Sequence, residues 1–337
     1  MQPCMAIQLK PLNEQVAVVF GASSGIGRAT ALQMAHGGAK IVAAARSESA
    51  LQSLVEEIER AGGTAIFVTA DVTKLADIKA VADSAIEKFG RIDTWVHCAA
   101  AAMWAIFEDT TPQEFSQIID VTLKGAAYGA MVALPHLKKQ GGALIQVASV
   151  ESVVAIPYQS AYATAKHGMK AYLDVLRIEL DHDDIPVSVT TIMPTGINTP
   201  FYNNARTKIG VKPVAPPPLY QPGIVAKAIC AAAQKPIPEI VVGGGGVFFA
   251  LSKRFAPHLT DAFLRLYTFR AQKTDEPKEA DAPTNLFKTL NDSRVEGDYD
   301  KSRGTSLATF LETRPSLRTA LGYGVLAGAL VLVARKK

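Results

Sequence analysis

Short apolar runs alternate with longer helical patterns over residues 15 to about 195, and this alternation constrains the fold more than any other feature. The runs are Gln15–Phe20, Lys40–Ala44, Thr64–Thr69, Thr94–His97, Gly142–Ala148 and Val187–Met193, with Ile240–Val242 as a candidate last strand. They are β-branched-rich and continuously apolar, as is typical of strands buried on both faces. The pattern predicts an α/β fold with a doubly wound parallel sheet and helices on both faces.

The segments between these runs have helical spacing. Leu51–Ala61 and Leu75–Phe89 carry apolar residues on one helical face. The stretch Thr111-Pro112-Gln113-Glu114 combines an N-cap, a proline at the first helical position and a capping-box glutamate, which predicts a helix over 112–139. We expect right-handed crossovers between the parallel strands.

The 337 residues suffice for one large domain with an extension. Because 48% of the residues are hydrophobic and 20% are charged, we expect a large buried core. We predict a dinucleotide-binding domain over 10–250, an amphipathic helical segment over 251–271, a linker over 272–316 and an apolar tail with a basic end over 317–337. Val211–Pro222 contains five prolines and is predicted to be a loop. Mixed charge and few large apolar residues over 272–305 favour disorder in the linker.

Charge and cysteine content limit the classes of partner and the cellular compartment that we expect for this protein. The net charge is only +4 and no basic block is present, which argues against nucleic-acid binding. The cysteines Cys4, Cys98 and Cys230 show no CxxC spacing, so we expect no disulfide framework and a cytoplasmic, reducing compartment. The start of the chain lacks the long apolar run of a signal peptide. Since the histidines lack metal-ligand spacing, no metal is predicted.

The sequence of the C-terminal tail is compatible with two kinds of binding partner, a membrane or a protein surface. Leu321–Val333 is apolar throughout and is followed by Arg335-Lys336-Lys337. The run is shorter than the roughly 20 residues of a spanning helix, although a basic end is typical of an anchored tail. It either contacts a membrane or docks as a helix on this protein or its oligomeric partner. The aromatic and basic stretch 248–270 is a second candidate membrane contact.

A glycine-rich turn follows the first run. Its sequence is Gly21-Ala22-Ser23-Ser24-Gly25-Ile26-Gly27, and a helical pattern comes next. A dinucleotide pyrophosphate needs backbone N–H groups at a helix N-terminus and no side chains in the way. An ordinary glycine-rich turn is the alternative, but the strand before it and the helix after it favour phosphate binding.

The end of the second run bears on the choice of nicotinamide cofactor. An NAD site calls for an acidic residue there to bind the ribose 2′-hydroxyl, and this chain has none until Glu48. Arg46 instead suits a 2′-phosphate, with Arg28 as a second cation near the same corner. We therefore predict NADP(H) over NAD(H), against the alternative that Arg46 is a solvated loop residue.

A candidate acid–base pair lies further along the chain. Tyr162 and Lys166 are four residues apart, so on a helix both side chains share one face. A phenol is a poor acid or base at neutral pH, and a neighbouring ammonium favours the phenolate and lowers the phenol pKa. Alone, such a pair also fits an ordinary helix surface. Ser149, at the end of the fifth run, adds a group that can stabilise a developing oxyanion.

The glycine spacing, Ser149, Tyr162 and Lys166, in this order, resemble the short-chain dehydrogenase/reductase family over about two-thirds of the chain. The resemblance implies hydride transfer between NADP(H) and a carbonyl or secondary alcohol. Tyr162 would be the general acid or base, Lys166 would lower its pKa and hold the nicotinamide ribose, and Ser149 would orient the substrate oxygen. It also implies a homodimer or homotetramer built on the helices that begin near 112 and 160. The further cofactor contacts that it implies are Asp71, Val72, Ala99, Pro194, Ile197 and Thr199.

The chain departs from the family pattern at several points. His97-Cys98-Ala99-Ala100 stands where the family commonly has Asn-Asn-Ala-Gly, and Thr195 replaces a glycine. Thr122 aligns with the catalytic asparagine that supports a proton path to the lysine. These departures keep open a cofactor-binding scaffold or redox sensor with weakened catalysis. A membrane-surface protein whose tail is the functional part is a third hypothesis. The expected substrate is a small carbonyl or alcohol, and the tail favours a lipophilic one.

Overall fold

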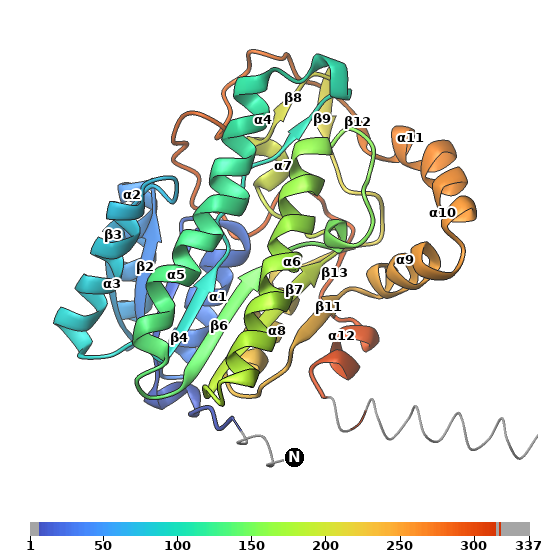
Figure 1. Ribbon diagram of the computed structural model, residues 1–337. Coiled ribbons are helices and arrows are strands. Elements are labelled where there is room, and N and C mark those ends of the chain that lie inside the picture. The colour runs from blue at the N-terminus through green and yellow to red at the C-terminus, as the bar shows by residue number, and fades with distance from the viewer. Residues whose placement is uncertain (1–6, 315–316, 318–337) are drawn as a thin grey trace, which may run out of the picture.

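A seven-stranded parallel sheet forms the centre of the computed structural model, which describes residues 7–314 and Leu317 (Figure 1). The strand order is β11-β7-β6-β4-β1-β2-β3. This confirms the predicted Rossmann-like, doubly wound fold, and each predicted strand lies within one residue of its observed bounds. The strands are β1 Val16–Phe20, β2 Lys40–Ala45, β3 Thr64–Thr69, β4 Thr94–His97, β6 Gly142–Val147, β7 Val187–Pro194 and β11 Glu239–Val242.

Helices cover both faces of this sheet, and the alternation along β1 shows why its strands are apolar throughout. Val16, Val18 and Phe20 pack into the core under α3, α5 and α6, whereas Ala17 and Val19 pack into the core under α1, α2 and α8. Both sets of side chains are therefore removed from water. The helices are α1 Gly25–His36, α2 Glu48–Arg60, α3 Leu75–Phe89, α4 Pro112–Ile119, α5 Gly125–Leu137, α6 Ser160–His182 and α8 Pro222–Ala232.

The predicted helix over 112–139 contains an irregular turn. Thr111 and Glu114 form the capping box at its start, as the sequence predicts. The π-helical turn η3, Asp120–Lys124, then separates α4 from α5. Within the described residues, 112–137 is the one helical stretch long and apolar enough to cross a membrane by length and composition. It packs against the sheet and against α6, and this burial accounts for its apolar character.

A helical arm stands at the side of the molecule beyond β11 (Figure 1). The amphipathic segment predicted to begin at 251 begins earlier, at Gly244. Many of its large apolar side chains face solvent, including Phe248, Leu251, Phe255, Leu259 and Leu266. The arm consists of α9 Gly244–Phe255, α10 Pro257–Phe263, the π-helical turn η5 Leu264–Thr268 and α11 Phe269–Ala271.

Residues 272–314, predicted as a largely disordered linker, instead pack against the domain. Strand β12 (Lys273–Pro277) pairs antiparallel with β9 (Val211–Pro213). Strand β13 (Ser302–Arg303) pairs in parallel with β10 (Leu219–Tyr220), and α12 (Leu307–Glu312) packs on β11. The two short strands β9 and β10 also interrupt the loop predicted over 211–222.

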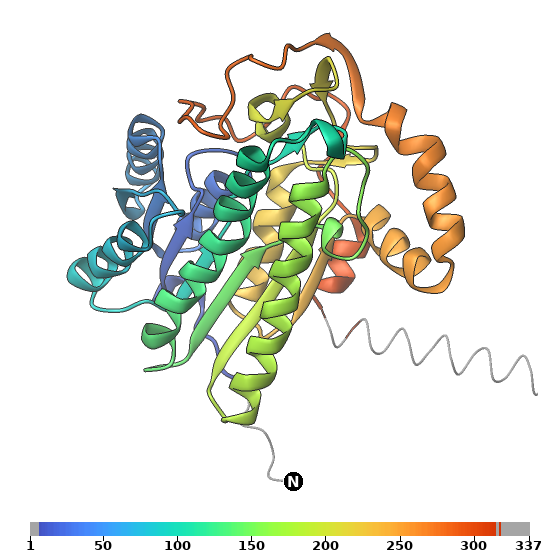
Figure 2. The same cartoon turned by 45° about the horizontal axis from the view of Figure 1, so that its top comes forward.

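Polar contacts largely hold this segment in place. Its composition is therefore that of a disordered linker, although the segment is ordered. Lys212, for example, forms ion pairs with Glu276 and Asp298, each at 2.9 Å. Figure 2 shows the segment crossing the top of the molecule from α11 toward the side of α1 and α2. The apolar run predicted for 321–333 lies outside the described residues.

Candidate active site

One cavity at the carboxyl ends of the central strands collects nearly all the predicted site residues. Parallel α/β sheets bind ligands at this edge, where the strand order reverses. Among the residues predicted for the site, Thr122 and Arg28 do not line the cavity. The predicted residues that line it are Gly21, Ser23, Ser24, Gly25, Ile26, Gly27, Arg46, Asp71, Val72, Ala99, Ser149, Tyr162, Lys166, Pro194, Ile197 and Thr199.

The glycine-rich turn has the geometry that a phosphate site needs. Gly21 and Gly25 adopt φ values of 75° and 54°, which favour glycine. A Cβ on Gly27 would lie 2.1 Å from the Gly21 carbonyl oxygen, so only glycine lets the helix start this close to the strand. The N-cap Ser24 makes no side-chain capping bond, unlike the N-caps of α2 and α4. The N-terminus of α1 thus suits an anionic ligand, with the Gly25 amide itself already bonded to the Arg294 carbonyl.

At the adenosine end of the cavity, the two predicted cations have different surroundings. Arg46 lines the cavity, and its guanidinium donates a hydrogen bond to the Asn285 carbonyl at 2.7 Å. Arg28 is buried beside α2, where it donates to the Ala50 carbonyl at 3.0 Å and pairs with Glu57 at 2.6 Å. Arg28 is therefore a structural cation, and the expectation that it serves the cofactor corner is wrong.

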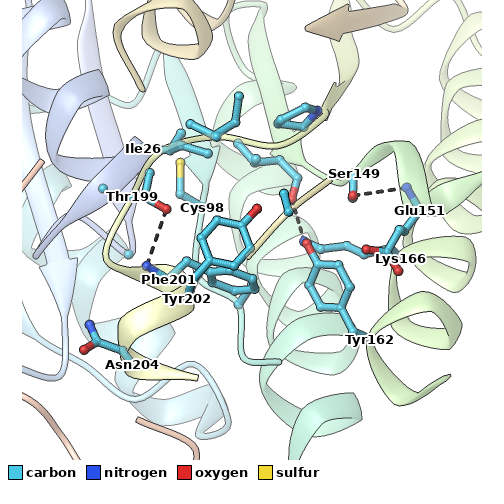
Figure 3. A pocket seen from close by; sticks show the side chains of 18 of the residues that line it. Ile26, Cys98, Ser149, Glu151, Tyr162, Lys166, Thr199, Phe201, Tyr202 and Asn204 are labelled. Carbon is cyan, nitrogen blue, oxygen red and sulfur yellow. Dashed lines mark hydrogen bonds between the residues drawn. The ribbon is translucent and has the colours of Figure 1, made fainter. Parts of the chain in front are cut away.

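The catalytic candidates come together from two elements (Figure 3). Ser149 lies two residues after β6, while Tyr162 and Lys166 lie one turn apart on α6. The Ser149 hydroxyl accepts a hydrogen bond from the Glu151 amide at 3.1 Å, and Ser149 and Tyr162 line the same cavity. The Lys166 ammonium lies 5.4 Å from the centre of the Tyr162 ring and donates to the Val147 carbonyl at 2.7 Å. The helical spacing therefore produces the shared site predicted from the sequence.

Burial dominates the ionisation of this pair. It raises the pKa of Tyr162, and the charge of Glu151 adds to that effect while the Ser149 hydroxyl opposes it. Burial also lowers the pKa of Lys166 to about 7, against smaller opposing effects of Cys98 and Glu151. We expected the ammonium to lower the phenol pKa. Because both groups lose water, the phenol instead keeps its proton more firmly.

Thr122 lies in the π-helical turn and is fully buried. Its hydroxyl accepts a hydrogen bond from the Ala101 amide at 3.0 Å and donates one to the Ala101 carbonyl at 3.1 Å. Both bonds go to backbone, so the hydroxyl fixes the loop after β4. His97 is also buried, stacks on Phe20, and has its pKa lowered by burial to about 3, so it stays neutral.

Sequence reasoning missed several groups that line the cavity. Glu151 follows Ser149 by two residues, and a lone acid within the apolar run Val150–Val154 was the available signal. Phe201 and Tyr202 form an aromatic wall. The C-terminal segment adds residues for which the sequence offered no periodic pattern, namely Asn285, Thr289, Leu290 and Asp292.

That last group belongs to a segment, 285–297, that we call the strap. The Gly25 amide donates to the Arg294 carbonyl at 2.9 Å, so the strap contacts the glycine-rich turn itself. The Ser47 hydroxyl donates to the Asn291 side chain at 2.9 Å. The Gly297 amide donates to the Asn198 carbonyl at 3.2 Å. The strap thus spans the candidate cofactor site from the end of β2 to the loop after β7.

Comparison with known proteins places this geometry in a family. Residues 15–210, more than half of the chain, match the family model described as short chain dehydrogenase. The chain belongs to the short-chain dehydrogenase/reductase family. Its members are oxidoreductases, and the match covers the glycine-rich turn, Ser149, Tyr162 and Lys166.

Relatives of this chain extend beyond the family core. It is 35% identical to the uncharacterized oxidoreductase YxnA of Bacillus subtilis, over 96% of this chain and 92% of that protein. It is 31% identical to the dehydrogenase/reductase SDR family member 7B of Bos taurus, over 80% and 85% of the two chains.

A solved structure supports the fold. The alcohol dehydrogenase of the archaeon Thermococcus sibiricus, complexed with 5-hydroxy-NADP, aligns with a TM-score of 0.60 and 26% identity. The alignment covers 68% of this chain and 95% of that one. A search of the described residues finds no group of three or more His, Cys, Asp or Glu side chains placed to hold a metal ion.

Proposed function

We propose that this short-chain dehydrogenase/reductase is an NADP(H)-dependent enzyme that interconverts a carbonyl and a secondary alcohol. The observation that carries the proposal is the position of Ser149, Tyr162 and Lys166 on the same cavity as the glycine-rich turn. Phosphate-binding backbone and an acid–base cluster in one cavity are what hydride transfer to a bound carbonyl requires.

Ser149, Tyr162 and Lys166 have different roles in the proposed reaction. Bound nicotinamide supplies the hydride to the carbonyl carbon, or accepts it from the alcohol. Ser149 holds the substrate oxygen, and the Tyr162 phenol donates the proton to that oxygen as the bond order falls. Lys166 holds the nicotinamide ribose and contributes positive charge near the phenol. Because burial raises the pKa of Tyr162, the phenol carries a proton at neutral pH that it can donate to the substrate oxygen.

The choice of NADP(H) over NAD(H) rests on Arg46. It directly follows β2, lines the cavity and has no acidic neighbour before Glu48. A guanidinium binds a phosphate through two parallel hydrogen bonds, which a ribose hydroxyl does not offer. A related archaeal structure holds an NADP derivative, which supports the same assignment.

The test is turnover by the full chain of a panel of aldehydes and ketones, with NADPH and NADH compared. Tyr162→Phe should abolish turnover and leave NADPH binding, measured by fluorescence, largely intact. Tyr172→Phe is the matched control, because this tyrosine lies on the same helix and hydrogen-bonds Gln146 outside the cavity. Unchanged turnover by Tyr162→Phe refutes the mechanism, and NADPH binding without any wild-type turnover favours the scaffold hypothesis.

A cytoplasmic enzyme that touches a membrane surface fits the helical arm. The arm exposes a set of large apolar side chains together with the cations Arg254 and Arg265. A face of this composition suits the boundary between anionic headgroups and acyl chains. Phe249, Leu264 and Thr268 of the same arm also line the cavity, which favours a lipophilic substrate.

A homo-oligomer fits the outer faces of α5 and α6. Met131, Val175 and Ile178 are exposed there, with Ile178 at 70%. Exposed apolar residues on neighbouring helices favour association of two copies. Light scattering of the full chain should therefore give at least a dimer mass, and Ile178→Glu should lower that mass.

A further inference from the structure

Glu151 is a buried acid that the proposed chemistry does not use. It lies in the short 3₁₀ turn Val150–Ser152, two residues beyond Ser149, and only 5% of it is exposed. It lines the same cavity as Ser149, Tyr162 and Lys166, and Figure 3 shows these four residues on one side of that cavity.

The backbone around Glu151 fixes its position. Its own amide donates a hydrogen bond to the Ser149 hydroxyl at 3.1 Å. Glu151 is therefore held in a fixed relation to the serine that would bind the substrate oxygen.

One oxygen of this carboxyl group has no partner. Among the described residues, none forms a hydrogen bond with the buried Oε2 atom of Glu151. Lys166, the nearest cation in the cluster, forms no ion pair with it within 4.0 Å and donates to the Val147 carbonyl instead. A buried polar atom without a partner destabilises a fold, so a ligand group that satisfies it explains why it is there.

Apolar side chains share the lining of this cavity with Glu151. They include Val150, Val154 and Ile156, which lie near Glu151 in the chain, and Leu264 of the helical arm. A pocket of this kind binds the carbon skeleton of a ligand through apolar contacts and fixes its orientation through a few polar groups. Glu151 is the polar group so placed beside the reacting position.

We infer that Glu151 is a specificity-determining residue that binds a second hydroxyl group of the substrate, close to the reacting carbon. The inference rests on the proposed function and names its substrate class, which is a lipophilic hydroxy-ketone or the corresponding diol. A hydroxyl both donates and accepts hydrogen bonds, so it can pair with either form of a carboxyl group. Burial raises the pKa of Glu151 to about 8, which populates both forms near neutral pH.

The test compares three matched probes: α-hydroxyacetophenone, α-methoxyacetophenone and propiophenone. They share the phenyl ring and the reacting carbonyl, and only the first carries a hydroxyl group, which is its one hydrogen-bond donor. The measurement is kcat/KM with NADPH for the wild type, Glu151→Met and Glu151→Gln. Thermal shifts of the cofactor-loaded chain with each probe supply a binding readout that does not depend on turnover.

The wild type should prefer the hydroxy-ketone over the methoxy probe by roughly tenfold to a hundredfold, because the methoxy probe leaves a buried carboxyl oxygen of Glu151 without a hydrogen-bond donor. Glu151→Met should abolish that preference, measured as the ratio of kcat/KM for the hydroxy-ketone to kcat/KM for the methoxy probe, whereas Glu151→Gln should retain most of it. Equal losses on all three probes, or no wild-type preference in turnover or binding, overturn the inference. Selective binding without turnover supports it and overturns the proposed reaction instead.

Discussion

Replacing the buried Glu151 with glutamine measures how much its burial costs the fold. Glutamine has nearly the same shape but does not ionise. In the folded chain burial raises the pKa of Glu151 from 4.5 to about 8. At pH 7 the unfolded chain therefore gains free energy by ionising this group, and the folded chain does not. At about 1.4 kcal/mol for each pH unit between 4.5 and 7, the penalty is roughly 3 kcal/mol.

The pH dependence has a definite sign. An acid whose folded pKa is raised leaves the fold at full stability below its unfolded pKa, and stability falls as the pH rises toward the folded pKa. The stabilisation by Glu151→Gln should therefore be near zero at about pH 4. It should grow through the window from 4.5 to about 8 and stay constant above it.

Urea denaturation of the wild type and of Glu151→Gln at several pH values within this window is the assay. The exposed Glu59 on α2 provides the control, since Glu59→Gln should change the unfolding free energy by less than about 0.5 kcal/mol. A Glu151→Gln variant as stable as the wild type at every pH would refute the argument that this carboxyl group is buried at a cost.

Three further outcomes are expected. Arg46→Ala should raise the KM for NADPH by roughly tenfold or more and leave that for NADH nearly unchanged, because only NADPH carries the 2′-phosphate; equal effects on both cofactors contradict the assignment. In Gly297→Ala the new Cβ would lie 2.6 Å from the Thr199 carbonyl oxygen, so the strap must lift. Stopped-flow fluorescence should show faster NADPH release, and urea denaturation should show a loss of about 1–3 kcal/mol in the free energy of unfolding. Gly304→Ala is the control, because its Cβ would enter open space, and it should change neither the release rate nor the stability. Phe255→Ser with Leu259→Ser should weaken flotation with anionic vesicles at least tenfold, and Leu307→Ser, equally exposed but outside the arm, should not; unchanged flotation argues against the arm as the membrane contact.

The sequence by itself determined the sheet and the central chemistry. Strands buried on both faces must be apolar at every position, so β1 could be recognised without its neighbours. The glycine-rich turn and the Tyr162/Lys166 pair are local patterns, because a turn and a four-residue helical spacing fix their geometry within a few residues. Ser149 could be located because it closely follows such a strand.

Only the tertiary structure decided the partners of individual polar groups. Arg28 and Arg46 looked alike in sequence, yet Arg28 is paired with Glu57 whereas Arg46 lines the cavity. The Thr122 hydroxyl turned out to be bonded to backbone, and burial rather than the ammonium set the pKa of Tyr162. The surroundings of a side chain depend on elements that are distant in the chain.

The strap is the clearest example of contacts that the sequence alone does not predict. Arg46 and Asn285 are 239 positions apart, and the bond between them uses a backbone carbonyl, which any residue possesses. A segment fixed by backbone hydrogen bonds and ion pairs has the same composition as a disordered linker. Apolar periodicity thus specified where the site is formed, whereas the residues that cover it were specified only when the chain had folded back on itself.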